Sequence, residues 1–66
     1  MMFSERLDLL LKEHNLSQAA LANAIGYSQR TISKWCNGQA DPSATAVKLC
    51  AQFFGVSADY LLGLED

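Results

Sequence analysis

The segment GYSQRTISKWCNG, residues 26–38, carries the side chains best suited to binding chemistry in this chain. At helical spacing, Ile32 and Trp35 fall together on one side of it. The opposite side carries long or hydrogen-bonding polar side chains and no acid: Arg30, Ser33, Lys34 and Asn37. Because these groups donate hydrogen bonds and add only positive charge, the face favours a partner rich in acceptors and negative charge.

The charges of the chain are unevenly distributed along the sequence. Five basic and seven acidic residues give a net charge of −2, which by itself disfavours a nucleic-acid partner. Residues 14–40 contain no acid, so Arg30 and Lys34 give that segment a charge of +2, while the rest carries −4. A polyanion responds to charge within a Debye length of about 8–10 Å, so the local sign matters more than the total.

The elements that must position this face are helices. Half of the residues are hydrophobic and 18% are charged, with one Pro and four Gly, which favours a single all-α domain over residues 1–66. The first predicted helix carries its apolar residues at i, i+4, i+7 and i+8, from Phe3 to Leu11, with Ser4 as N-cap and an end near Asn15.

Four further helices are predicted to begin after serines. They cover about residues 18–25, 29–36, 44–54 and 58–62, and their N-caps would be Ser17, Ser28, Ser43 and Ser57. Gly26 and Gly55 would end the second and fourth helices in the left-handed conformation. Caps and periodicity agree at each of these boundaries, which is typical of a sequence that specifies one fold.

The connection between the second and third helices is very short, which predicts a steep crossing and close packing. Ala22 supplies a small residue at the crossing, and Ile32 and Trp35 supply apolar anchors behind the third helix. A helix held from behind with its outer side displayed suits a DNA major groove, which is about 12 Å wide.

The segment LSQAALANAIGYSQRTISKWCNG resembles the helix-turn-helix of the lambda-repressor and Cro family of bacterial and phage regulators. With Gln18 as its first position, Ala22 matches the small fifth residue, Gly26 the turn glycine, and Ile32 and Trp35 the later core positions. ERLDLLLKEHNLSQ resembles the first helix of the family, and NGQADPSATAVKLCAQFFGVSADYLLG its fourth and fifth. The resemblance implies a compact five-helix DNA-binding domain whose helix-turn-helix is formed by helices two and three.

The resemblance also implies roles for individual residues. Base edges would be contacted by Gln29, Arg30 and Lys34, with Ser33 at the margin, and the DNA backbone by Gln18, Ser28 and Asn37. The side-chain chemistry agrees, because Gln pairs bidentately with adenine, and Arg or Lys with guanine. Tyr27 either packs on the turn or offers its hydroxyl to a phosphate. The family often carries acids at the positions of Cys36, Ala19 and Ala20, and their absence here removes repulsion from DNA.

Other chemistries have weaker support in the sequence. Cys36, Cys50 and His14 lack the spacing of a metal site, and nothing indicates a Cys–His nucleophile, a cofactor or a small-molecule ligand, so no enzyme is predicted. Without an apolar run long enough to span a membrane, or a signal peptide, the expected location is cytoplasmic, with both thiols reduced. Leu61, Leu62 and Leu64 are expected to close the core, or to provide a dimer contact.

The sequence therefore predicts a DNA-binding transcriptional regulator, of the repressor type and of phage, prophage or bacterial origin. It would bind double-stranded DNA as a homodimer on a palindromic operator, with one recognition helix per half-site. The alternative is a protein-interaction module, or an antitoxin-type partner-binding protein, on the same scaffold. The acidic total and the short chain favour that alternative, and the terminal leucines would be its contact.

Overall fold

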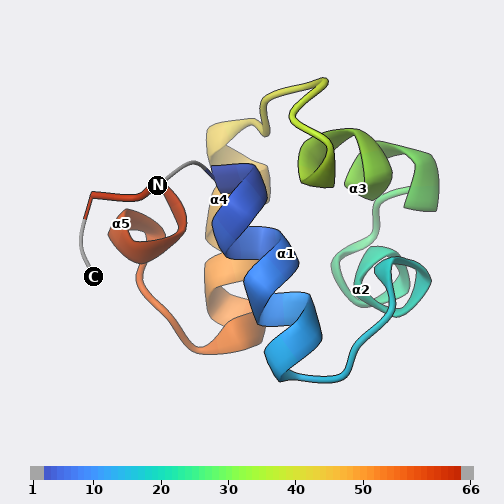
Figure 1. The fold of residues 1–66 in the computed structure, drawn as a ribbon, viewed down its shortest axis with the longest axis horizontal. Helices are drawn as coiled ribbons and strands as arrows, with labels where there is room; N and C mark the ends of the chain where they lie inside the picture. Colours follow the sequence, from blue (N-terminus) through green and yellow to red (C-terminus); the bar gives the residue numbers. More distant parts are fainter. Residues whose placement is uncertain (1–2, 65–66) are drawn as a thin grey trace.

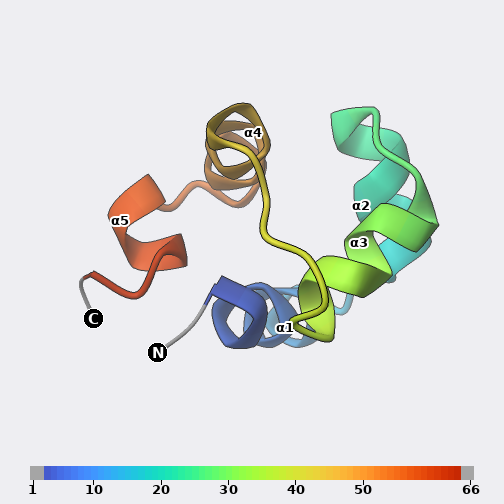
Figure 2. The same ribbon diagram turned by 90° about the horizontal axis from the view of Figure 1, so that it is seen from above.

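The computed structural model describes residues 3–64 and contains five helices in that range. They are α1 (Phe3–Glu13), α2 (Gln18–Ile25), α3 (Gln29–Cys36), α4 (Ala44–Phe54) and α5 (Ala58–Leu61). In Figure 1 α1 lies in front of α4 at the centre, and Figure 2 shows these two helices apart, with α2 and α3 to one side of them and α5 to the other. The predicted all-α, five-helix architecture is confirmed.

Four serines cap the helices as the sequence predicts. The Oγ atom of each accepts a hydrogen bond from the backbone N–H three residues later, at 3.0 Å for Ser17 and Ser57 and 3.1 Å for Ser28 and Ser43. Each cap satisfies an N–H that lacks a partner within its helix, which typically contributes about 1 kcal/mol to stability.

The start of α1 differs from the expectation, because Ser4 lies inside the helix rather than at its cap. Phe3 is already helical and buried, with its ring edge-on to Trp35 at a centroid distance of 6.1 Å. Burial of this ring against α3 accompanies a helix that includes Phe3 and Ser4, two residues before the start that a cap at Ser4 would give.

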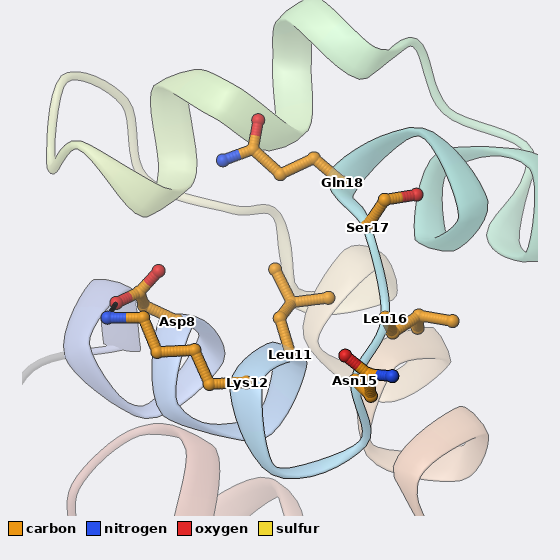
Figure 3. Close-up of a pocket in the computed structure, with 7 residues that line it drawn as sticks. All are labelled: Asp8, Leu11, Lys12, Asn15, Leu16, Ser17 and Gln18. Atoms are coloured by element: carbon orange, nitrogen blue, oxygen red, sulfur yellow. Dashed lines mark ion pairs between the residues drawn. The ribbon is translucent and has the colours of Figure 1, made fainter.

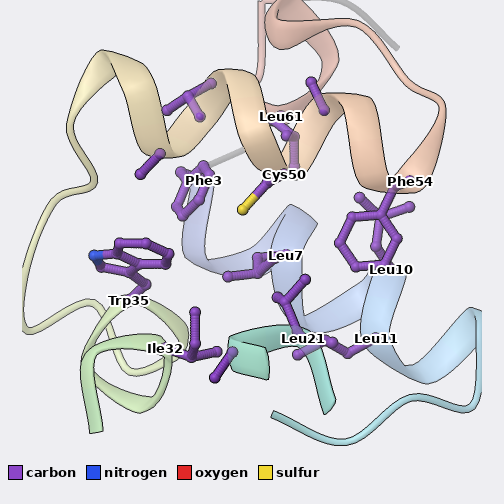
Figure 4. Packing of buried hydrophobic residues seen from close by; sticks show 14 residues of the cluster. Phe3, Leu7, Leu10, Leu11, Leu21, Ile32, Trp35, Cys50, Phe54 and Leu61 are labelled. Atoms are coloured by element: carbon purple, nitrogen blue, oxygen red, sulfur yellow. The ribbon is translucent and has the colours of Figure 1, made fainter. Parts of the chain in front are cut away.

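The core collects one or more side chains from every helix. Figure 4 shows this cluster, which includes Leu7, Leu21, Ile32, Trp35, Cys50 and Leu61. Leu61 is fully buried, whereas Leu62 and Leu64 are 45% and 72% exposed. The expectation that all three close the core is therefore wrong for the last two, because α5 is only four residues long and turns a single apolar position inward.

Arg6 is an unexpected member of the interior. Its side chain is buried, and its guanidinium carbon lies 4.3 Å from the centre of the Tyr60 ring. A cation over an aromatic face is attracted by the ring's quadrupole, which offsets part of the cost of its burial. Arg6 therefore joins α1 to α5 instead of adding charge to the surface.

Candidate nucleic-acid interface

Helices α2 and α3 pack closely across the turn at Gly26. Gly26 adopts φ +80°, and its N–H and that of Tyr27 both donate to the carbonyl of Ala22 at 2.9 Å. Ala22 is itself buried, as a small residue at a close crossing must be. Because a left-handed φ strains any residue with a Cβ, glycine fixes where α2 ends and how α3 leaves it.

Two buried side chains, Ile32 and Trp35, hold the inner side of α3 against the core. Ile32 is 0% exposed and Trp35 is 3% exposed. The Trp35 ring packs against both Phe3 and Tyr27, with the Tyr27 ring centroid 5.1 Å away and tilted by 59°. Rings packed in this way fix both the rotation and the depth of the helix. The outer face of α3 is therefore displayed in one orientation.

The outer side of α3 presents the predicted polar face to solvent. Gln29, Arg30 and Lys34 are exposed, and Ser33 lies beside them half-buried. Within residues 3–64, neither Arg30 nor Lys34 forms an ion pair, so both charges are available to a ligand. Asn37 is exposed directly after the helix, where its backbone N–H caps α3 on the carbonyl of Ser33.

The first turn of α3 contains a contact that the sequence did not indicate. The hydroxyl oxygens of Ser28 and Thr31 lie 2.8 Å apart, in addition to the cap bond from the Thr31 N–H to Ser28 Oγ. Thr31 thereby fixes the orientation of Ser28, one of the predicted backbone contacts. A threonine three residues after a serine cap is the only sequence signal that could have revealed it.

The sequence leaves two interpretations open for Tyr27, packing on the turn or a hydrogen bond to a phosphate. The structure places its ring half-buried against Trp35, so packing on the turn is one of its roles. A hydrogen bond from its hydroxyl to a phosphate stays a prediction.

Gln18 lies half-buried at the start of α2, on one wall of an open groove of about 430 Å³. Figure 3 shows Gln18 extending beneath α3, with Asp8 and Lys12 of α1 on the opposite wall. Burial and the nearby Asp8 carboxylate raise the pKa of the Cys36 thiol, while a hydrogen bond from the Gln18 side chain lowers it. Gln18 therefore connects the first turn of α2 to the last turn of α3.

The sequence of the chain matches the model of a protein family described as helix-turn-helix over residues 7–61. The chain belongs to the helix-turn-helix family. The match extends from α1 to the end of α5, so it covers the supporting helices as well as the helix-turn-helix itself.

Two curated relatives and one solved structure illustrate the likeness. The HTH-type transcriptional activator BcrR of Enterococcus faecalis is 38% identical over 66 residues, all of this chain and 32% of BcrR. The uncharacterized HTH-type transcriptional regulator YobD of Bacillus subtilis is 32% identical over 65 residues, 98% of this chain and 58% of YobD. The chain thus spans about a third and somewhat over half of the lengths of these two relatives.

The structural match is to a DNA-bound protein of similar size. The P22 c2 repressor protein, crystallised in complex with a synthetic operator, superposes with a TM-score of 0.91 at 28% identity, and the alignment covers 98% of both chains. The lambda-repressor-like helix-turn-helix fold expected from the residues is thereby confirmed.

The residues considered for metal or nucleophilic chemistry are His14, Cys36 and Cys50. The His14 ring packs edge-on against Phe54 with centroids 5.1 Å apart, and Cys36 and Cys50 are free thiols. Among the described residues, no three His, Cys, Asp or Glu side chains are grouped to hold a metal ion. None of the described helices is long and apolar enough to cross a membrane.

Proposed function

We propose that this helix-turn-helix protein is a sequence-specific transcriptional regulator that binds double-stranded DNA through α3. The observation that carries the proposal is the exposed face of α3, which has no acid and is held rigidly from behind by Ile32 and Trp35. The likeness to the P22 c2 repressor, which was crystallised on an operator, supports the same orientation.

In the proposed complex, α3 lies in the major groove. Gln29, Arg30 and Lys34 contact base edges, with Ser33 at the margin of the contact. Gln18, Ser28, Tyr27 and Asn37 bind the sugar–phosphate backbone and so fix the register of α3. These residues border α3 at both ends, so backbone contacts on either side would prevent the helix from sliding along the groove.

The proposed assembly on DNA is a homodimer with two-fold symmetry. Each protomer would contact one half-site of a palindromic operator, and the two recognition helices would lie about 34–36 Å apart. Leu62, half-exposed just after α5, is the candidate dimer contact. Pairing would double the phosphate contacts of a chain that has a net charge of −2 and few basic residues.

The direction of regulation is proposed to be repression, in which a bound dimer excludes polymerase from a promoter. Of the similar proteins, the P22 protein is named a repressor and BcrR an activator. Because prokaryotic DNA lies in the cytoplasm, the regulator would act there, by binding and not by catalysis. A promoter fused to a reporter separates the two directions: repression lowers the signal when the chain is expressed, and activation raises it.

A second candidate function is a protein-interaction module. The observation that favours it is the exposure of Leu62 and Leu64 at the end of the described chain, together with the acidic total charge. Selection from a random double-stranded DNA library at low salt distinguishes the two. Enrichment of an inverted repeat is the result expected for a DNA-binding regulator, whereas no enriched half-site would favour the interaction module.

A further inference from the structure

An ion pair borders the groove between α1 and the start of α2. The groove is lined by Asp8, Leu11, Lys12, Asn15, Leu16, Ser17 and Gln18. The Lys12 Nζ atom lies 3.0 Å from Asp8 Oδ2, one helical turn away on α1. Figure 3 shows this pair facing Gln18 across the groove. A basic side chain thus lies opposite the residue proposed to bind a DNA phosphate.

The pair holds Lys12 only loosely. The Lys12 side chain is 75% exposed and that of Asp8 is 46% exposed. Exposed pairs of this kind contribute little to stability, because water and salt screen both charges. A phosphate oxygen, which accepts a charge-assisted hydrogen bond at least as well as a carboxylate, can therefore displace Asp8 from Lys12.

Asp8 also acts across the groove on the recognition helix. Its negative charge contributes to raising the pKa of Cys36 in the last turn of α3. A carboxylate whose field reaches Cys36 also reaches an anion bound at Gln18, whose side chain hydrogen-bonds to that thiol. Asp8 therefore opposes a phosphate at this position, in addition to holding Lys12.

The distribution of basic residues makes Lys12 important. The chain has five basic residues, of which Arg6 is buried over Tyr60 and Lys48 lies on α4. Arg30 and Lys34 occupy the outer face of α3. Lys12 is thus the one basic side chain that lines the groove next to the proposed backbone contacts.

We propose that Lys12 is an additional DNA-backbone contact, which exchanges its partner Asp8 for a phosphate oxygen when α3 enters the major groove. The inference rests on the proposed DNA-binding function and adds to it two residues that the sequence did not single out. Asp8 limits affinity: the free protein keeps Lys12 neutralised, and binding must break the pair. An ion pair outside the helix-turn-helix thereby lowers DNA affinity.

The exchange is tested with the full chain and a duplex containing the selected operator. Lys12→Gln should weaken binding by about five- to tenfold at 0.1 M salt and lower the slope of log affinity against log salt by about 1 per protomer. Lys48→Gln, which removes the same charge from α4, is the matched control and should change neither quantity. Both side chains are exposed, so circular dichroism and urea unfolding should show an unchanged fold.

Asp8→Asn separates exchange from simple repulsion. The variant should tighten binding by about threefold or more, since it frees Lys12 and removes an opposing charge. The same change in a Lys12→Gln background should give a clearly smaller gain. An equal gain in both backgrounds would mean that Asp8 only repels DNA, and the exchange would be wrong.

Two further outcomes keep this inference distinct from the function on which it rests. If the wild-type chain selects an operator and Lys12→Gln behaves like Lys48→Gln, the role of Lys12 is refuted while DNA binding stands. If the wild-type chain selects no sequence at all, the proposed function itself fails, and Lys12 has no phosphate to bind.

Discussion

The Trp35 ring meets the Phe3 ring edge-on at 6.1 Å, which joins the recognition helix to the first described residue of α1. The contact links residues 32 positions apart, and both rings are buried. The position of α3 therefore depends on the start of α1 as well as on the turn at Gly26.

Replacing Trp35 by Ala should cost about 3–5 kcal/mol of unfolding free energy, because it leaves a large cavity between α1 and α3. Urea unfolding followed by circular dichroism measures the loss. In a domain this small, such a loss is expected to leave much of the protein unfolded at 37 °C. A loss below about 1 kcal/mol would show that the ring is not the anchor of α3.

The serine caps permit a matched comparison between stability and binding. Ser28→Ala and Ser57→Ala each remove a cap bond of similar length, so each should cost at least about 1 kcal/mol in urea unfolding. Ser28→Ala also removes the hydroxyl contact with Thr31. Only Ser28 belongs to the proposed interface. Operator affinity should therefore fall for Ser28→Ala at a temperature where both variants are folded, and stay unchanged for Ser57→Ala. Equal affinities would remove Ser28 from the interface.

These residues also show how far the sequence could predict the structure. Four caps and the inner face of α3 follow from local rules, since a serine before a periodic segment and an i, i+3 apolar pair need no knowledge of the rest of the chain. Ser4 fails as a cap because a tertiary contact, the burial of Phe3, extends α1. Leu62 and Leu64 fail as core residues because α5 ends at Leu61, one residue before the predicted end, and turns only Leu61 inward.

The proposed interface was predictable to a similar extent. The displayed side chains of α3 follow from its period, and in the structure Gln29, Arg30 and Lys34 are exposed while Ser33 is half-buried. The Ser28–Thr31 hydroxyl contact lies within the first turn of α3, where only the spacing of the two residues could have indicated it. The position of Lys12 opposite Gln18 depends on the packing of separate segments, which periodicity does not encode. The burial of Arg6 over Tyr60 was missed for a similar reason. A charged residue in α1 is expected at the surface, and only the position of α5 shows that Arg6 is covered.

Stability should fall at high pH through the buried thiol of Cys50. Burial, and secondarily Cys36, raise the pKa of Cys50 from 9.0 to about 11 in the folded chain. Above pH 9 the unfolded chain loses this proton while the folded chain keeps it, so the unfolding free energy decreases as pH rises from about 9 through 11. Below pH 9 both states hold the proton, and no slope arises from this group.

Urea unfolding between pH 8 and 11 measures the effect, with Cys50→Ala as the comparison. The variant will be less stable at pH 8 because it loses buried volume, but its decline with pH should be shallower than that of the wild-type chain. The other titrating groups are common to both proteins and cancel in the difference. If the unfolding free energies of the two proteins declined in parallel with pH, the loss of stability would not come from the Cys50 thiol.

The proposed dimer predicts a selective effect at Leu62. Leu62→Asp would place a charge in an apolar contact, which is costly unless the charge is paired. Affinity for the full palindrome should then fall towards that for an isolated half-site, while half-site affinity is retained. Leu9→Asp, on the surface of α1 at 39% exposure against 45% for Leu62, is the matched control. If the two variants bind the palindrome equally well, the dimer contact lies elsewhere.

Sequence selectivity should depend on the two exposed cations of α3, Arg30 and Lys34. Arg30→Ala and Lys34→Ala should each remove about 1–3 kcal/mol of discrimination at the base pair they contact, since each would lose a guanine pairing. Their combination should leave weak, sequence-independent binding with a smaller salt slope. Library selection with each variant identifies the position that becomes degenerate, and Lys48→Ala on α4 should reproduce the wild-type site. Because a loss of charge alone would weaken all sequences equally, relaxed selection at one base pair, and not weaker binding as such, is the result that assigns each residue to the groove. An unchanged selected site in the double variant would place recognition on another surface.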